Sequence, residues 1–302
     1  MVRTLVLNSE SIVPNTNNSV LRYTFPQGGI YLKDEYIAVQ QISLYNSVYN
    51  ISSALDNNTF SYTWIDGTVN QVVMPSAGIH LTLSQLNSYL QSVMITNNHY
   101  YTNSGQNVYL LEIIVNQSQY AYQINSFATS AAIALANAWV QPVGATWVNP
   151  TLSIMPMFNV PATKFRELIG FDAGSYPNTV ILATGANLPP NQTQTPVQTS
   201  PYSVLSQSAP QIEPQPTYLG LCSLVNNELV IPNETIISIT PIGATFGGLF
   251  NIQYSGLAYN KVDDGNYTQF TFSFVDDLGQ RIKFQDPNML IILIMKNRND
   301  PF

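Results

Sequence analysis

Two pairs of adjacent aspartates are the residues with the clearest potential for chemistry. Asp263-Asp264 and Asp276-Asp277 each stand just before a short Gly-containing segment. Paired carboxylates can bind calcium, or act as the acid and base of a glycoside hydrolase. Asp is also common in turns, because its side chain accepts hydrogen bonds from the local backbone, and neighbouring strand residues point to opposite faces. We therefore expect both pairs to form hairpin turns.

Histidine, cysteine and glycine supply no further set of this kind. The two histidines, His80 and His99, are far apart in the sequence, whereas a metal site normally needs several clustered ligands. We expect each histidine at the surface or at a sheet edge. Cys222 is the single cysteine, so no internal disulfide forms, and we expect a small buried apolar residue. The segment Gly243–Gly248, GATFGG, lacks the Lys-Ser/Thr of a phosphate-binding loop.

Aromatic residues are the remaining candidates for binding. Trp64, Trp139 and Trp147, together with 18 tyrosines, could line a sugar-binding platform. Aromatic residues on alternating strands more often fill a core or a subunit interface. No Ser nucleophile motif of the G-x-S-x-G type is present. We therefore expect no catalytic, cofactor-binding or metal site, no cofactor and no enzymatic activity.

Short strands with a period of two are the elements that position these residues. Phe270, Phe272 and Phe274 alternate with polar residues, which is typical of an antiparallel sheet with one buried face. The same alternation occurs over 20–25, 60–65 and 250–254, and near-continuous apolar runs, with both faces expected to be covered, occur over 108–115 and 289–295. Residues 267–296 are expected to form a three-stranded meander. Many strands and few helices predict an all-β sandwich or jelly roll.

Three short helices interrupt the strands. Thr82 and Gln85 have the spacing of a capping box and predict a helix that reaches about residue 96. An Ala-rich segment predicts a second helix, capped by Ser126 and ending near residue 139. Thr163 is the expected cap of a third helix, and Gly170 its stop. Sheet proteins place such helices across open ends or edges, so we expect them to have a packing role.

The segment 188–216 differs in composition from the rest of the chain. Pro, Gln, Thr and Ser dominate it, and Glu213 is its only charged residue. Proline removes a backbone donor, so this segment cannot be a central strand. We expect an extended loop or arm, and two interpretations stay open: order imposed by a neighbouring subunit, or a plain flexible loop.

Composition restricts the class of protein. Charged residues make up 9% of the 302 residues, and the net charge is −7. No basic stripe of the kind that nucleic-acid binding needs is present, so we expect no direct nucleic-acid binding. The N-terminal residues are too short in apolar length for a signal peptide, and no run approaches the ~20 apolar residues of a membrane helix. The scarcity of charge is typical of a surface that other subunits cover. We expect Asn, Gln, Thr and Tyr at such an interface, and Asp and Glu at exposed turns.

The C-terminal part of the chain carries a family resemblance. Residues 222–232 read CSLVNNELVIP, 236–241 read IISITP, and 267–296 read YTQFTFSFVDDLGQRIKFQDPNMLIILIMK. These segments are similar to the C-terminal strands of penton, or minor capsid, proteins of virophages and Maverick/Polinton-type elements. Residues 165–177, FRELIGFDAGSYP, resemble a helix and turn of the same proteins. The resemblance covers about residues 160–302, while the N-terminal half agrees only in texture and length.

The resemblance implies a fold and a role. The fold would be a single eight-stranded jelly roll over residues 1–302, with 60–160 as a candidate insertion. The role would be a homopentameric penton at the fivefold vertices of an icosahedral double-stranded DNA virus. Its partner would be a double-jelly-roll major capsid protein, and it would belong to a virion assembled in the host cytoplasm. No catalytic residue transfers from the family, and the Arg-Gly-Asp receptor motif of some penton bases is absent.

Two other functions remain as alternatives at this point. A carbohydrate-binding module or lectin-like attachment protein could use the same β-sandwich and predicts an exposed aromatic platform beside Asp and Asn. A glycoside hydrolase would instead place two carboxylates across a sugar-binding cleft. The positions of the tryptophans and of the aspartate pairs discriminate between these functions.

Overall fold

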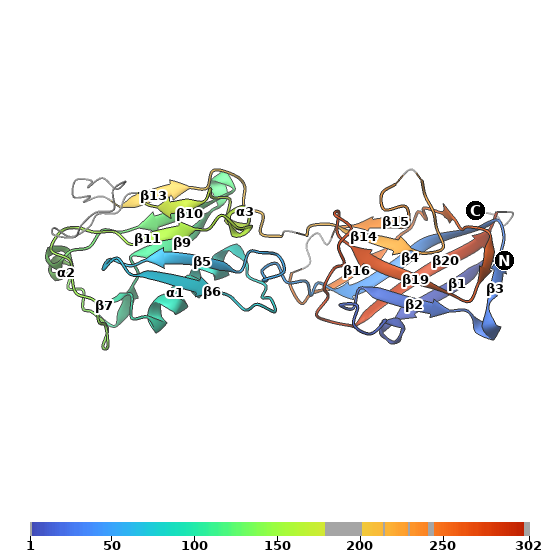
Figure 1. The fold of residues 1–302 in the computed structure, drawn as a ribbon, viewed down its shortest axis with the longest axis horizontal. Helices are drawn as coiled ribbons and strands as arrows, with labels where there is room; N and C mark the ends of the chain where they lie inside the picture. The colour runs from blue at the N-terminus through green and yellow to red at the C-terminus, as the bar shows by residue number, and fades with distance from the viewer. Residues whose placement is uncertain (1, 179–200, 214, 229, 241–244, 299–302) are drawn as a thin grey trace. The chain divides into compact units, whose positions relative to one another are not determined.

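The computed structural model describes residues 2–178, 201–213, 215–228, 230–240 and 245–298. The chain divides into two compact units: unit 1 comprises Met1–Tyr49 and Gln215–Phe302, and unit 2 comprises Asn50–Pro214 (Figure 1). Each unit has its own cluster of buried apolar side chains. Residues 60–160, the candidate insertion, lie wholly within unit 2.

Unit 1 contains two antiparallel sheets of four main strands each. One sheet has the order β1 (Arg3–Asn8), β20 (Met289–Asn297), β4 (Glu35–Tyr45) and β16 (Leu249–Gln253). The other has the order β15 (Thr235–Ile239), β14 (Tyr218–Cys222), β19 (Gln269–Val275) and β2 (Val20–Thr24). Smaller elements are η1 (Ser9–Ser11), η2 (Pro26–Gly28), β3 (Ile30–Leu32), which pairs with β18 (Gly265–Tyr267), and β17 (Asn260–Lys261), which pairs with β4.

The strand order of unit 1 is that of a jelly roll. Numbered one to eight along the chain, the main strands lie in the orders 1-8-3-6 and 2-7-4-5. These are the two sheets that result when a long antiparallel hairpin rolls up into two Greek keys. The expected single eight-stranded jelly roll is confirmed. All of its strands come from unit 1, and unit 2 enters the chain between its third strand, β4, and its fourth, β14.

The core of unit 1 follows the predicted alternation. Phe270, Phe272 and Phe274 are buried in β19, and the rings of Phe272 and Phe274 meet edge to face at 5.3 Å between centroids. Strand β20 lies between β1 and β4; its residues alternate between buried and half-buried over 289–293, and both faces are buried over 293–296, so the prediction that both faces are covered holds only for the second half of the strand. Burial of these side chains holds the two sheets together, because each large apolar side chain contributes about 1.5–3 kcal/mol.

The predicted meander over residues 267–296 is wrong. Strand β19 pairs with β14 and β2, whereas β20 pairs with β1 and β4 in the other sheet. After the turn, Arg281 bridges back to Val275, but Phe284 already bridges to Val48. The side chains of Ile282 and Phe284 are buried, and they take the chain across the core from one sheet to the other.

Unit 2 combines two sheets, a hairpin and the helices. Its four-stranded sheet has the order β12 (Gly174–Tyr176), β11 (Met157–Val160), β5 (Thr59–Thr63) and β6 (Val69–Val73). Its three-stranded sheet has the order β13 (Tyr202–Leu205), β10 (Ala121–Ser126) and β9 (Leu111–Asn116). The hairpin is β7 (Tyr101–Asn103) with β8 (Gln106–Val108), and the helices are α1 (Leu83–Thr96), α2 (Ala131–Ala136), α3 (Phe165–Ile169) and η3 (Gln117–Gln119).

The predicted start of α1 and the predicted stop of α3 are confirmed, whereas the predicted caps of α2 and α3 are wrong. The N-cap position of α3 is Lys164, and the Thr163 hydroxyl beside it accepts a hydrogen bond from the Phe165 amide at 3.3 Å. The capping box of α1 is present, and α3 ends at Gly170, whose φ of 75° is left-handed. Helix α2 begins after Ser130, whose hydroxyl accepts a hydrogen bond from the Ile133 amide at 3.2 Å. Ser126 instead lies in β10, where its hydroxyl donates to the Pro156 carbonyl. Ser126 is therefore a strand residue bonded to Pro156 and does not cap α2.

The remaining local predictions are modified by tertiary contacts. The apolar run over 108–115 is divided between β8 and β9, because residues 109 and 110 belong to neither strand. Strand β13 lies within the Pro-rich segment, in a stretch that contains no proline, and occupies a sheet edge, so the expectation that this segment forms no central strand is met by residues 202–205. Residues 188–200 of the expected arm lie outside the described residues. Within the described part of the chain, no helix is long and apolar enough to cross a membrane.

Candidate functional site

The pair Asp276-Asp277 is a turn, as predicted. Asp276 is buried, and its Oδ1 accepts hydrogen bonds from the amides of Leu278, at 3.0 Å, and Gln280, at 2.7 Å. Its Oδ2 accepts from Nε2 of Gln215 at 3.1 Å. Asp277 is exposed. The Asp276 carboxylate thus accepts hydrogen bonds from the backbone of the turn, whereas the Asp277 carboxylate faces solvent. The two do not form a shared catalytic or metal-binding pair.

The pair Asp263-Asp264 also serves the backbone, although not in a hairpin. Oδ1 of Asp264 accepts from the Asp34 amide at 3.0 Å, and the Asp263 carbonyl accepts from the Tyr267 hydroxyl at 2.9 Å. The strands on either side, β17 and β18, pair with different partners, so the prediction of a hairpin at this place is wrong. Burial, followed by the charges of the two aspartates, raises the pKa of Tyr267.

His99 is a core residue, which contradicts the expected surface position. It is 7% exposed, its Nδ1 lies 2.8 Å from the Tyr62 hydroxyl, and its ring stacks on Trp64 with centroids 4.9 Å apart. Burial lowers the pKa of His99, and the more distant Asp66 charge opposes this only in part. A neutral imidazole between two aromatic neighbours stabilises the core of unit 2. The sequence alone did not indicate this, because its aromatic partners come from a distant strand.

The tryptophans do not form an exposed sugar platform. Trp64 and Trp147 are buried at 1% and 4% exposure, and their rings meet edge to face. Nε1 of Trp147 donates to the Asn98 carbonyl at 2.7 Å. Trp139 is half-buried against Tyr101. The three tryptophans therefore supply no exposed platform of the kind that the carbohydrate-binding alternative predicts.

Two further titratable groups of unit 1 are structural. Cys222 is fully buried, and burial raises the pKa of its thiol to about 12. Glu35 in β4 is also buried, and its Oε1 pairs with Nη1 of Arg3 at 3.5 Å. Buried Glu35 shows that not all acidic residues lie at exposed turns. Among the described residues, no cluster of three or more His, Cys, Asp or Glu side chains could hold a metal ion.

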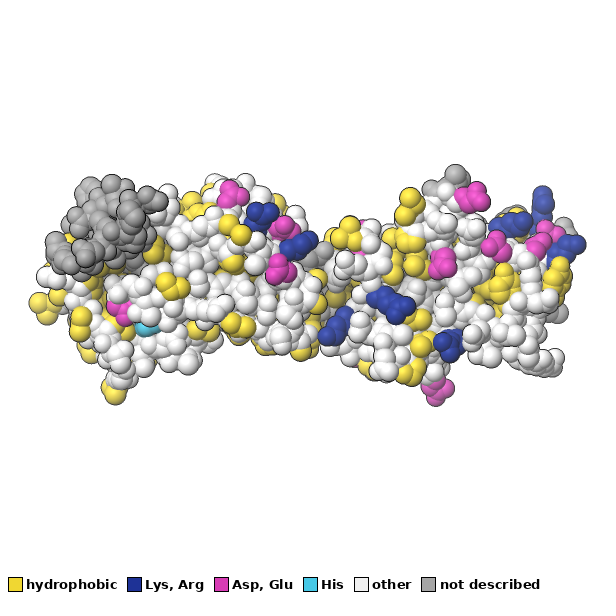
Figure 2. All heavy atoms as spheres, viewed as in Figure 1, with side chains coloured by type: hydrophobic (Ala, Val, Ile, Leu, Met, Phe, Trp, Pro, Cys, Tyr) yellow, Lys and Arg dark blue, Asp and Glu magenta, His cyan; other side chains and the backbone are white. Residues whose placement is uncertain are grey.

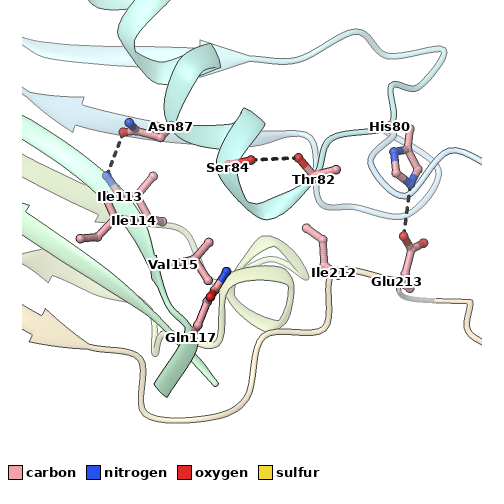
Figure 3. A pocket seen from close by; sticks show the side chains of 10 residues that line it. All are labelled: His80, Thr82, Ser84, Asn87, Ile113, Ile114, Val115, Gln117, Ile212 and Glu213. Carbon is pink, nitrogen blue, oxygen red and sulfur yellow. Dashed lines mark hydrogen bonds and ion pairs between the residues drawn. The ribbon is translucent and has the colours of Figure 1, made fainter. Parts of the chain in front are cut away.

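A pocket of about 450 Å³ lies in unit 2. It lies between the start of α1, the strand β9 and the segment 212–213 (Figure 3). Ile113, Ile114, Val115 and Ile212 provide its apolar lining, and the polar residues are His80, Thr82, Ser84, Asn87, Gln117 and Glu213. A volume of this size is within the range of ligand sites in proteins.

Polar contacts fix the walls of this pocket. Nε2 of His80 lies 3.2 Å from Oε1 of Glu213, which connects the loop before α1 to the Pro-rich segment. Oδ1 of Asn87 accepts from the Ile113 amide at 3.0 Å and so attaches α1 to β9 (Figure 3). Sequence reasoning placed no function on these residues. The one available signal was Glu213, the single charge in segment 188–216.

A smaller cavity continues the pocket along the same strand. It has a volume of about 230 Å³ and shares Val115, Gln117 and Ile212 with the larger pocket. Its other lining residues are Tyr120, Ala121 and Pro210. We call the two cavities together the β9 groove. Apart from His80 and Glu213, the lining residues are uncharged, so the groove can bind a ligand through shape and neutral hydrogen bonds.

The fold and the site define an eight-stranded jelly-roll protein with an inserted second unit. No protein-family model and no curated protein sequence matches the chain. Among solved structures, the chain is similar to the mavirus penton protein, with a TM-score of 0.48 and 11% identity over 98% of this chain and 97% of that chain. It is also similar to a chain in the structure of the Sputnik virophage, with a TM-score of 0.39 and 10% identity over 97% of each chain.

Proposed function

We propose that this protein is a structural capsid subunit, the penton of an icosahedral double-stranded DNA virus. The observation that carries the proposal is the strand order of unit 1, 1-8-3-6 and 2-7-4-5, which is a complete eight-stranded jelly roll. Folds alone do not define functions. The resemblance of residues 165–177 and 222–296 to virophage and Maverick/Polinton penton proteins gives this jelly roll its proposed role. The positions of the aspartates and tryptophans support a structural protein over an enzyme or a lectin.

The assembly we propose is a cyclic pentamer. Such a ring repeats one heterologous interface until it closes. Val6 and Leu249 support lateral contacts, because each is about half exposed, at 48% and 58%, on an edge strand of the same sheet, β1 and β16. The face shown in Figure 2 consists mostly of uncharged side chains, with few acidic and basic residues between them. A surface depleted of charge is typical of the buried part of subunit interfaces.

The mass of the purified protein in solution tests this assembly. Light scattering at micromolar concentration is expected to give five times the chain mass of 33.4 kDa, and negative-stain images are expected to show rings. A monomeric mass under these conditions would overturn the pentamer. Leu249→Arg is expected to weaken the ring, whereas Leu278→Arg, at a turn where the side chain is 74% exposed, serves as the matched control.

The proposed partner outside the pentamer is a double-jelly-roll major capsid protein, and the proposed location is the virion, assembled in the host cytoplasm. In this proposal unit 1 forms the capsid domain and unit 2 is an insertion with a binding role of its own. A neighbouring gene for a double-jelly-roll protein is expected. Co-expression of the two proteins and purification through a tag on one should recover both, and a failure to co-purify would contradict the partner.

A further inference from the structure

The β9 groove contains a strand edge without a strand partner. Strand β9 is the last strand of its sheet, and it pairs only with β10. The Ile113 amide bonds to the side chain of Asn87, so it points away from β10. Because backbone groups alternate in direction along an antiparallel strand, the amide and carbonyl of Val115 point to the same free edge.

The hydrogen bonds of the neighbouring strand β10 agree with this alternation. Val115 lies opposite Tyr122 in the register of β9 and β10. The Tyr122 amide bonds to the Ser206 hydroxyl, and its carbonyl accepts from the Ser206 amide, so both point away from β9. Val115 and Tyr122 are therefore a non-hydrogen-bonded pair. Within the described chain the N–H and C=O of Val115 have no hydrogen-bond partner, and they lie between the two cavities.

We propose that the β9 groove binds an extended peptide segment of a partner protein by strand addition at Val115. An added strand would exchange two backbone hydrogen bonds with Val115, which is the usual source of affinity in this mode of recognition. Side chains at alternate positions of that strand would enter the apolar cavities on either side of Ile212, so the segment would carry apolar residues at i and i+2. The inference concerns unit 2 alone and does not depend on the proposed function.

Charge further defines the partner. The acidic group of the lining is Glu213, and unit 2 carries six Asp or Glu residues but only Lys164 and Arg166 as basic ones. An acidic segment would be repelled, so the expected peptide is uncharged or basic at its ends. The lining contains a single aromatic residue, Tyr120, at its far end. A sugar, which usually stacks on aromatic rings, fits this surface less well than an aliphatic peptide.

The test is selection from a displayed library of random heptapeptides on the immobilised full-length protein. We expect enriched sequences with Val, Ile or Leu at i and i+2 and without Asp or Glu. A synthetic copy of an enriched peptide is then methylated at each amide nitrogen in turn. Strand addition at Val115 predicts loss of binding of about tenfold or more when the one amide that donates to the Val115 carbonyl is methylated, and a much smaller effect at the amides on either side of it, which point away from the edge.

Matched variants locate the site. Val115→Pro removes the edge amide and is expected to weaken binding of the enriched peptide about tenfold or more. Val73→Pro is the control, since Val73 lies on β6, an edge strand of the other sheet of unit 2, and does not line the groove. Ile212→Ser tests the apolar wall without altering the backbone of β9. No enrichment, an equal effect of methylation at every amide, or equal binding by all three variants and the native protein would each overturn the proposal.

Discussion

Gly220 provides the most stringent test of the packing of the jelly roll. It lies in β14, between β15 and β19, where the register of β14 with β15 shifts by a bulge. A Cβ atom placed on Gly220 would lie 2.6 Å from Cγ2 of Ile237 and 2.8 Å from Cζ of Phe272. Both separations are shorter than carbon atoms tolerate. Gly220→Ala therefore forces two neighbouring side chains to move.

The loss of unfolding free energy in Gly220→Ala depends on which of the two neighbouring side chains can move. Ile237 is only half-buried and can shift toward solvent, whereas Phe272 is fully buried against Phe274. Overpacking of a core costs about 1–3 kcal/mol. Replacing Gly by Ala also restricts the unfolded chain, which stabilises the fold by about 0.4–1 kcal/mol. The expected net effect of Gly220→Ala is a loss of about 1–2 kcal/mol of unfolding free energy.

Urea unfolding followed by circular dichroism and by fluorescence measures this loss and assigns it to a unit. All three tryptophans lie in unit 2, so tryptophan fluorescence reports that unit alone. With a urea dependence of about 1–3 kcal/mol per molar, Gly220→Ala should lower the circular-dichroism midpoint of unit 1 by about 0.3–2 M. The fluorescence midpoint should remain unchanged.

Gly256→Ala is the matched control in the same unit. No atom lies within 4 Å of the Cβ position at Gly256, and its φ is compatible with other residues. This variant is expected to be neutral or slightly stabilising. Equal midpoints for Gly220→Ala and Gly256→Ala would refute the close packing of β14 against Phe272, and with it the arrangement of the second sheet.

Three further predictions concern titratable groups. Asp276→Ala should destabilise unit 1 by about 1.5–3 kcal/mol in urea unfolding, because the amides of Leu278 and Gln280 lose a charged acceptor, whereas Asp277→Ala should stay within about 0.5 kcal/mol; equal losses would contradict the turn role. The folded-state pKa of His99 lies below 6.5, so the unfolded chain binds a proton more readily, and the stability of unit 2 should fall as pH decreases below about 6.5. His99→Phe should flatten this dependence in Trp64 fluorescence, and an unchanged pH slope would argue against it. The Cys222 thiol, with a pKa raised to about 12, should react with a thiol reagent at neutral pH only in the unfolded protein, so rapid labelling of the native protein would show that it is accessible.

Features that depend on neighbours in sequence were predictable. The alternation of Phe270, Phe272 and Phe274 correctly indicated a buried face, and the spacing of Thr82 and Gln85 correctly indicated the start of α1. Gly170 ends α3 because the position requires a left-handed φ. In each case the interactions that decide the structure lie within a few residues, so the sequence pattern contains them.

Features that depend on contacts between residues far apart in the sequence could not be predicted from the sequence. Serine is a common residue type at helix caps, yet Ser126 lies in strand β10, where its hydroxyl donates a hydrogen bond to the Pro156 carbonyl. His99 was expected at the surface, but the fold places it against Tyr62 of β5 and Trp64 of the loop that follows β5. The β9 groove could not be predicted from the sequence for the same reason, because its lining residues Val115 and Ile212 are far apart in the chain.

The sequence by itself determined an all-β protein with a buried aromatic face, polar turns and little charge, because burial and turn chemistry act on local patterns. Tertiary structure alone decided that β19 and β20 belong to opposite sheets and that all eight strands of the jelly roll come from the two chain segments on either side of unit 2. Strand pairing is decided by which buried faces and edges meet across long stretches of chain. A period of two indicates that a strand exists, but it is the same for every possible partner.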